Sequence, residues 1–142
     1  MFTLNCKGRL LTINEPIVIF FRFTNELLNI KELIEKSGRT VGIMSGNTND
    51  LKIWQNGKID VLCIQLQKGG VGIDLTRSHY TIYYSKGYNP LDYKQSLART
   101  LRPGQLHNVI YYHIIVQKTI DEIIEKALES KDRNVNYVLS ML

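Results

Sequence analysis

Short apolar runs alternate along this chain with segments of helical spacing, and this alternation restricts the fold more than any other feature of the sequence. Five runs predict strands, at 17–21, 40–44, 61–64, 80–84 and 109–116. An unbroken apolar run of this length is typical of a strand buried on both faces, as in a parallel sheet covered by helices.

The segments between and after these runs predict helices over 24–38, around 51–54, over 90–101 and from 119 onward. Thr24 and Thr119 are the predicted N-caps, because each precedes apolar residues at three- and four-residue intervals. Strands that alternate with helices over short connections form right-handed βαβ units. We therefore expect an α/β fold, a three-layer α/β/α sandwich with a mainly parallel sheet. Ligands of such sheets bind beyond the carboxyl ends of the strands.

The chain has 142 residues, of which 44% are hydrophobic and 22% charged, as in a single globular domain. No apolar stretch approaches the roughly 20 residues that span a bilayer, and Cys6 and Cys63 are expected to be reduced thiols of a cytoplasmic protein. The expected organisation is one domain over 1–142, with a lead-in at 1–14, a motif-bearing core at 15–131 and a C-terminal helical segment at 119–142.

The net charge of +5 resides in the middle third of the chain. Residues 52–102 hold three acidic side chains and eight basic ones, the latter being Lys52, Lys58, Lys68, Arg77, Lys86, Lys94, Arg99 and Arg102. This asymmetry is typical of a surface that faces phosphates, in nucleic acid or nucleotide. A solvated basic face without a partner would look the same.

The segment Gln-Ser-Leu-Ala-Arg-Thr-Leu-Arg-Pro-Gly-Gln carries an amide and two guanidiniums at helical spacing. On a helix, Gln95, Arg99 and Arg102 would form one polar stripe. The two like charges would repel, which suggests an anionic partner, and planar guanidiniums suit phosphate oxygens. The alternative is a pair of exposed arginines that interact with the dipole at a helix C-terminus.

This segment resembles motif VI of superfamily-2 helicases in its Swi/Snf-type form. Other blocks resemble, in family order, motif IV, its following turn, motif V, the Trp-Asn-Pro segment and the closing Thr-x-Glu/Asp-Glu sequence: 17–23, 44–48, 67–76, 88–90 and 119–122. The resemblance extends from about Glu15 to Lys131. A glycine loop alone would be a weak signal, but the ordered set is specific.

The resemblance implies the RecA-like (P-loop NTPase-like) C-terminal lobe of an ATP-dependent DNA helicase or translocase. In that family a first lobe holds ATP and magnesium, and the second lobe supplies arginines to the γ-phosphate. By motif position, Arg102 is the arginine finger, and Arg99 and Gln95 lie beside it. Asp74 is implied as a partner of the ribose hydroxyls, and Gly72 lets the backbone approach the nucleotide. An inserted arginine can raise the rate by about 10³–10⁵.

We also expect contacts with the DNA backbone from residues near three strand ends: Arg22, Phe23, Ser45, Gly46, Asn47, Gln65, Lys68 and Gly69. For Arg22 and Phe23, at the end of the first strand, a structural role is the alternative. One departure lies in this set, since Gln-Leu-Gln-Lys at 65–68 replaces the usual Ser-Thr-Arg-Ala. Leu66 stands where a threonine would touch DNA, and Gln65 and Lys68 could substitute for it. Ala98 stands where many superfamily-2 proteins have glycine.

The sequence has neither a Gly-x-x-x-x-Gly-Lys-Ser/Thr loop nor an Asp-Glu-x-His box. We therefore expect an inactive isolated chain whose partners are DNA and an N-terminal RecA-like ATPase lobe, with no membrane partner. Magnesium-ATP would be held mainly by that lobe, and no cofactor tightly by this chain. His79, His107 and His113 lack metal-ligand spacing, and His113 is expected to be a satisfied core residue. The alternative function is a degenerate, non-catalytic lobe that binds nucleic acid or protein.

Overall fold

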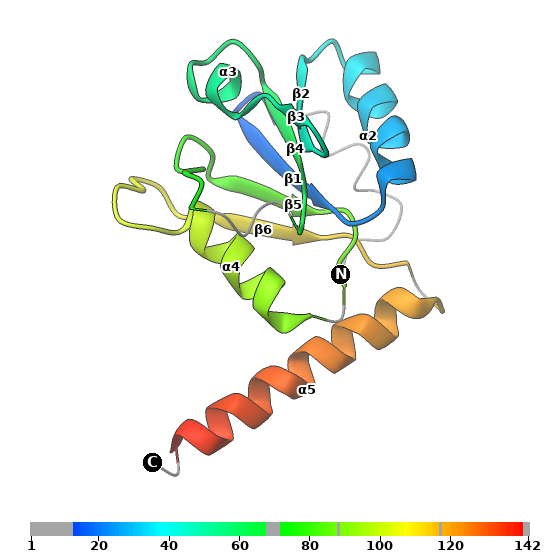
Figure 1. The fold of residues 1–142 in the computed structure, drawn as a ribbon, viewed down its shortest axis with the longest axis vertical. Helices are drawn as coiled ribbons and strands as arrows, with labels where there is room; N and C mark the ends of the chain where they lie inside the picture. The colour runs from blue at the N-terminus through cyan, green and yellow to red at the C-terminus, as the bar shows by residue number, and fades with distance from the viewer. Residues whose placement is uncertain (1–12, 68–71, 88, 117, 141–142) are drawn as a thin grey trace.

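A computed structural model describes residues 13–67, 72–87, 89–116 and 118–140, and the side chains of these residues up to 130. Within them, one six-stranded sheet has the order β3-β2-β4-β1-β5-β6 (Figure 1). The strands are β1 (Ile17–Phe21), β2 (Val41–Ser45), β3 (Thr48–Asn49), β4 (Val61–Gln65), β5 (Tyr80–Tyr83) and β6 (Ile110–His113).

The centre of the sheet is parallel, as the apolar runs predict. Ile17 of β1 lies beside Val61 of β4 on one side and Tyr80 of β5 on the other. All five residues of β1 are buried, because both faces of the sheet are covered. The exception to the parallel arrangement is β3, which pairs antiparallel with β2.

The helices are α2 (Thr24–Lys36), α3 (Leu51–Gln55), α4 (Pro90–Thr100) and α5 (Ile120–Ser140). One hydrophobic cluster packs alternate β1 residues against Ile30 and Ile34 of α2, and the other packs Val18 and Phe20 with Trp54 of α3 and with α4. The three-layer α/β/α architecture is therefore confirmed, with α2 on one face and α3 and α4 on the other (Figure 1). Helix α5 crosses below α4, and its C-terminal end extends away from the sheet (Figure 1). Among the described residues, no helix is long and apolar enough to cross a membrane.

Several predicted element ends are wrong, each for a local reason. Thr24 is the first helical residue rather than the N-cap, because the backbone N–H of Phe23 donates to the Glu26 carboxylate at 3.0 Å. Strand β6 ends at His113 instead of 116, because its partner β5 ends at Tyr83. Thr119 is confirmed as a cap, since its hydroxyl accepts from the N–H of Asp121 at 3.3 Å.

Candidate functional site

The loop after β4 meets the C-terminal end of α4, and this contact brings together two of the predicted motifs. The N–H of Leu75 donates to the carbonyl of Arg99 at 3.1 Å, and Nη1 of Arg102 donates to the carbonyl of Ile73 at 3.2 Å. The Leu75 side chain is fully buried in the core and anchors the loop there. The structure thus places Asp74, between Ile73 and Leu75, next to the arginine segment.

Helix α4 is oriented by a polar face that it buries against β5. Ser96 hydrogen-bonds to the Tyr83 hydroxyl at 2.6 Å, and Thr100 to Thr81 at 3.2 Å. Both Ser96 and Thr100 are fully buried, which fixes the rotation of the helix. Gln95 and Arg99 are left half-buried on its other faces.

The prediction that Arg102 continues the helical stripe is wrong. Helix α4 ends at Thr100, and Arg102 lies in the exposed turn that follows. The cause is local, because the residue before a proline avoids helical backbone and Gly104 adopts a φ of +100°. Arg102 therefore presents its guanidinium from a turn, next to the loop that carries Asp74.

Asp74 is an exposed carboxylate whose orientation is set by its own loop. Its Oδ1 accepts from the N–H of Thr76 at 2.9 Å and from the Thr76 hydroxyl at 2.7 Å. These two hydrogen bonds, with a smaller contribution from the Arg102 guanidinium, lower the pKa of Asp74. The carboxylate is thus ionised at neutral pH. Nearby, Gly72 has a φ of +38°, a region that favours glycine.

The predicted DNA-contacting residues at the strand ends also lie together. The Ser45 hydroxyl donates to the Gln65 amide oxygen at 2.9 Å, and the Gln65 amide nitrogen donates to the carbonyl of Arg22 at 3.1 Å. These contacts join the carboxyl ends of β2, β4 and β1. Gly46 and Asn47 are exposed in the adjoining turn, whereas Lys68 and Gly69 lie outside the described residues.

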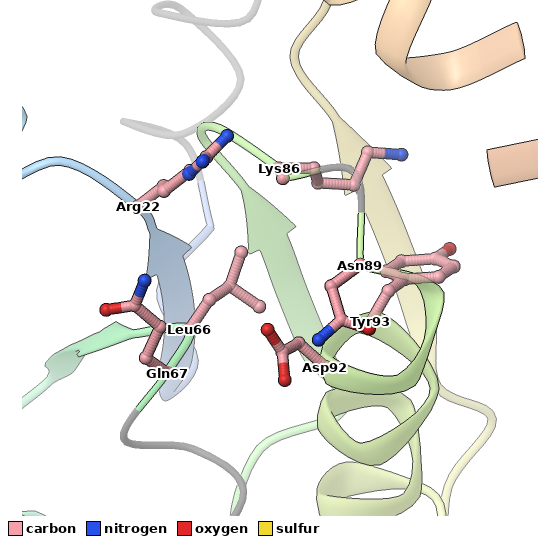
Figure 2. A pocket seen from close by; sticks show the side chains of 8 residues that line it. Arg22, Leu66, Gln67, Lys86, Asn89, Asp92 and Tyr93 are labelled. Atoms are coloured by element: carbon pink, nitrogen blue, oxygen red, sulfur yellow. The ribbon is translucent and has the colours of Figure 1, made fainter. Parts of the chain in front are cut away.

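Arg22 lines one edge of a pocket of about 360 Å³, and the exposed Phe23 follows it in the chain. The Arg22 guanidinium lies 5.0 Å from the centroid of the Phe23 ring. It also rests over Gly87, where an added Cβ would lie 3.3 Å from Nη1, so a larger residue there would displace it. The pocket is lined by Arg22, Leu66, Gln67, Lys86, Gly87, Asn89, Asp92 and Tyr93 (Figure 2).

Sequence reasoning missed the wall of this pocket that α4 supplies. Asn89 caps α4 by accepting the N–H of Leu91 at 3.0 Å, and Asp92 projects from the first turn toward Leu66 and Gln67 (Figure 2). The available signal was their position, since Asn89 lies within the Tyr-Asn-Pro block at 88–90 and Asp92 follows two residues after it.

Two of the eight basic residues in the middle third serve the fold. Arg77 lies 5.0 Å from the Trp54 ring and donates to the carbonyl oxygens of Trp54 and Ile59. Lys86 is buried and forms an ion pair with Glu125 of α5, and its ammonium points toward α5 (Figure 2). Fewer basic side chains are thus available to bind phosphates than the net charge of the sequence suggests.

The Lys86 ammonium hydrogen-bonds to Nδ1 of His113, at a distance of 2.7 Å. Since an ammonium only donates, Nδ1 accepts and the imidazole is neutral. Burial, and then the Lys86 charge, lower the pKa of His113 to about 4. His113 is hydrogen-bonded within the fold, as expected for it.

The described residues offer groups whose chemistry suits parts of a nucleotide. They contain no group of three or more His, Cys, Asp or Glu that could hold a metal ion. Guanidiniums at the end of α4 suit phosphate oxygens, and the Asp74 carboxylate suits hydroxyl donors.

The model of the family described as "Helicase conserved C-terminal domain" matches residues 4–104. The chain belongs to this helicase C-terminal family. Its relatives include the putative ATP-dependent helicase/translocase YwqA of Bacillus subtilis, 30% identical over 125 residues, which cover 83% of this chain and 14% of YwqA. The ATP-dependent helicase fft3 of Schizosaccharomyces pombe is 31% identical over 82% of this chain and 13% of its own length.

A solved structure, the C-terminal part of the Fun30 ATPase domain, has a TM-score of 0.77 and 25% identity, over 87% of this chain and 43% of that one. The Swi/Snf-type resemblance and the RecA-like helicase C-terminal fold are thereby confirmed. This helicase lobe spans about one-seventh of the length of the two curated relatives.

Proposed function

We propose that this chain is the second motor lobe of an ATP-dependent DNA helicase or translocase. In this proposal it supplies Arg102 and Arg99 to ATP held with magnesium on a separate N-terminal lobe. The observation that carries the proposal is the position of Arg102. Its guanidinium is exposed, yet it is tied by a hydrogen bond to the loop that carries an ionised Asp74.

The chemical role follows from charge. Phosphoryl transfer depends on positioning and on stabilisation of charge on the transferring oxygens. A preorganised guanidinium acts on that charge without reorganisation during the reaction. Arg99 and Gln95, half-buried on α4, would lie beside it, Asp74 would accept from ribose hydroxyls, and the neighbouring Gly72 would let the backbone approach the nucleotide.

DNA is the second ligand of the proposal. Arg22 and Phe23, the Ser45–Asn47 turn and Gln65 would follow one backbone across the carboxyl edge of the sheet. Lys68 and Gly69 belong to the same proposed track. Support comes from the hydrogen bonds that hold Ser45, Gln65 and Arg22 together at this edge.

The test is DNA-stimulated ATP hydrolysis by the motor that contains both this chain and its N-terminal lobe. We expect Arg102→Ala to lower kcat by about 10³-fold while the KM for ATP changes little, because the contact is strongest in the transition state. Arg102→Lys should rescue poorly, since an ammonium lacks the planar fork. The control Lys58→Ala removes an exposed cation from the same third of the chain. Unchanged turnover in Arg102→Ala, with loss of DNA or partner affinity instead, would favour a non-catalytic binding lobe.

A further inference from the structure

The side chain of Gln105, three residues after Arg102, reaches three backbone carbonyl groups. Its Nε2 lies 3.2 Å from the oxygen of Thr76, 3.0 Å from that of Ser78 and 3.2 Å from that of Thr100. Its Oε1 accepts from the N–H of His107 at 3.2 Å. The whole amide is therefore engaged within the protein, and the two N–H protons are shared among three acceptors.

These acceptors belong to the two segments that form the proposed nucleotide site. Thr76 is the residue that holds the Asp74 carboxylate, and Ser78 is fully buried at the end of the same loop. Thr100 is the last residue of α4. Gln105 thus connects the C-terminal end of α4 to the loop that carries Asp74.

The turn that carries Arg102 lies between these attachment points. Residues 101–104 are all exposed, so burial contributes little to its order. Hydrogen bonds fix it instead, because the backbone N–H of Gln105 donates to the carbonyl of Arg102 at 3.1 Å while its side chain holds the loop. The guanidinium of Arg102 in turn contacts Ile73 of that loop.

We propose that Gln105 is a positioning residue for Arg102, which fixes the arginine turn against the loop that carries Asp74. The inference rests on the proposed function, since Arg102 is the group whose position matters for hydrolysis. Misplacement of a reacting group by about 1 Å can cost on the order of 10²-fold in rate.

The kinetic test uses the two-lobe motor with DNA. We expect Gln105→Ala to lower kcat by about 10- to 100-fold with the KM for ATP within about twofold, the pattern of an interaction lost in the transition state. Gln105→Glu should lose at least as much, because a carboxylate offers no donor to the three carbonyls. The double variant Gln105→Ala/Arg102→Ala should be no slower than Arg102→Ala alone, since the effect passes through Arg102.

Gln55→Ala is the matched control. Gln55 also donates its amide to the loop, to the carbonyl of Asp74 at 2.9 Å, but it does so from α3 and not from the arginine turn. It should leave kcat within about threefold, because one exposed hydrogen bond contributes little. If Gln105→Ala does not fold, Gln105→Asn replaces it, because it keeps the amide on a side chain one methylene shorter.

A second measurement needs no hydrolysis. In the isotopically labelled 142-residue chain, the side-chain Nε–H order parameter of Arg102 should fall, and exchange of the Leu75 amide should rise, in the folded Gln105 variant and not in Gln55→Ala. Unchanged order of Arg102 in that variant, or a double variant slower than Arg102→Ala by the full Gln105 effect, would overturn the inference. If Arg102→Ala itself leaves turnover unchanged, the proposed function fails instead, and the order parameter still decides the role of Gln105.

Discussion

Asp74 and Arg102 show how neighbouring residues of opposite charge can remain available to a ligand. Both hydrogen bonds that Asp74 accepts from Thr76 reach Oδ1, so the orientation of the carboxylate is fixed through one oxygen. The lowered pKa of Asp74, caused first by these bonds and then by Arg102, keeps the group an acceptor at neutral pH. In the proposed function, this oriented acceptor would bind a ribose hydroxyl and the Arg102 guanidinium a terminal phosphate.

The first prediction tests the proposed ribose contact of Asp74 separately from the phosphate contact of Arg102. Asp74→Ala should raise the KM for ATP in the two-lobe motor by about 10-fold or more, since hydrogen bonds to charged groups contribute about 1.5–3 kcal/mol. The wild type should prefer ATP to 2′-deoxy-ATP, and the variant should lose that preference. Asp74→Asn, which can still accept from Thr76, serves as the milder change. An ATP to 2′-deoxy-ATP ratio that stays constant across these variants would remove Asp74 from the ribose site.

At the scale of elements, the strands of the sheet were predictable because burial on both faces leaves a pattern in the sequence. The apolar runs at 17–21 and 61–64 both became central parallel strands, β1 and β4. Strand β3 was not predictable, since Thr48 and Asn49 are exposed and polar and pair only through their backbones. The end of α4 was missed by one residue because Pro103 acts on the backbone before it.

The candidate site likewise contains residues that could be predicted from the sequence and residues that could not. Ser45, Gln65 and Arg22 could be grouped in advance, because parallel strands end at a common edge of the sheet. The role of Gln105 could not, since its acceptors are backbone carbonyls that carry no residue-specific signal. Neither could the burial of Lys86, whose partner Glu125 follows it by 39 positions and meets it only in the folded chain.

The ion pair between Lys86 and Glu125 connects α5 to the loop after β5, and His113 lies against it. Tyr83 stacks on the His113 ring with a centroid separation of 5.1 Å, and the Tyr93 hydroxyl lies 3.3 Å from Nε2. Protonation of His113 would place a second cation next to the Lys86 ammonium. We therefore expect the contact between α5 and the rest of the fold to weaken when His113 is protonated.

The second prediction is a pH dependence of stability. The pKa of His113 is lowered from 6.5 to about 4 in the folded chain, so between these values the unfolded chain binds a proton that the folded chain does not. The free energy of unfolding should thus fall as the pH decreases through this range, by on the order of 2 kcal/mol for this half-buried group. Urea titrations of wild type and His113→Gln between pH 7 and pH 4 test this, with His107→Gln, at an exposed site, as the control. Identical pH slopes for His113→Gln and wild type would contradict it.

At the scale of the whole molecule, the connection from β4 to β5 links the two proposed ligand regions. It leaves the carboxyl edge of the sheet at Gln65, where the proposed DNA contacts lie. It ends at the amino edge, where the Ser78 hydroxyl donates to the carbonyl of Pro16, just before β1. Between these points it carries Asp74 past the end of α4. The described parts of this connection therefore lie in both proposed ligand regions.

The third prediction is that the isolated chain does not hydrolyse ATP, with or without DNA. Its sequence lacks the Gly-x-x-x-x-Gly-Lys-Ser/Thr loop and the Asp-Glu-x-His box, and its described residues contain no cluster of three or more metal-ligating side chains. Arginines at the end of α4 stabilise charge and cannot alone generate the attacking water. Phosphate release by highly purified chain should equal the buffer rate. Release above that rate that is abolished by Arg102→Ala would contradict the prediction, because the activity would then belong to this chain.

The last prediction concerns how strongly the lobe alone holds DNA. Of the cations in residues 52–102, Arg77 and Lys86 are committed to the fold, so only part of the +5 charge can displace counterions from phosphates. We therefore expect weak, sequence-independent binding. The plot of log K against log salt concentration should have a slope of about −2 to −4, as for a few phosphate contacts.

Arg22→Ala should reduce that slope by about one, since each phosphate contact contributes close to one unit. Lys58→Ala should reduce it less, because the exposed Lys58 lies three residues before β4, at the amino edge of the sheet. Fluorescence anisotropy with labelled duplexes of two unrelated sequences, from 20 to 200 mM salt, measures both quantities. Tight or sequence-specific binding, or no binding at the lowest salt, would contradict the proposed track. We therefore expect the charge that remains exposed after folding, rather than the charge counted in the sequence, to set the salt dependence of DNA binding.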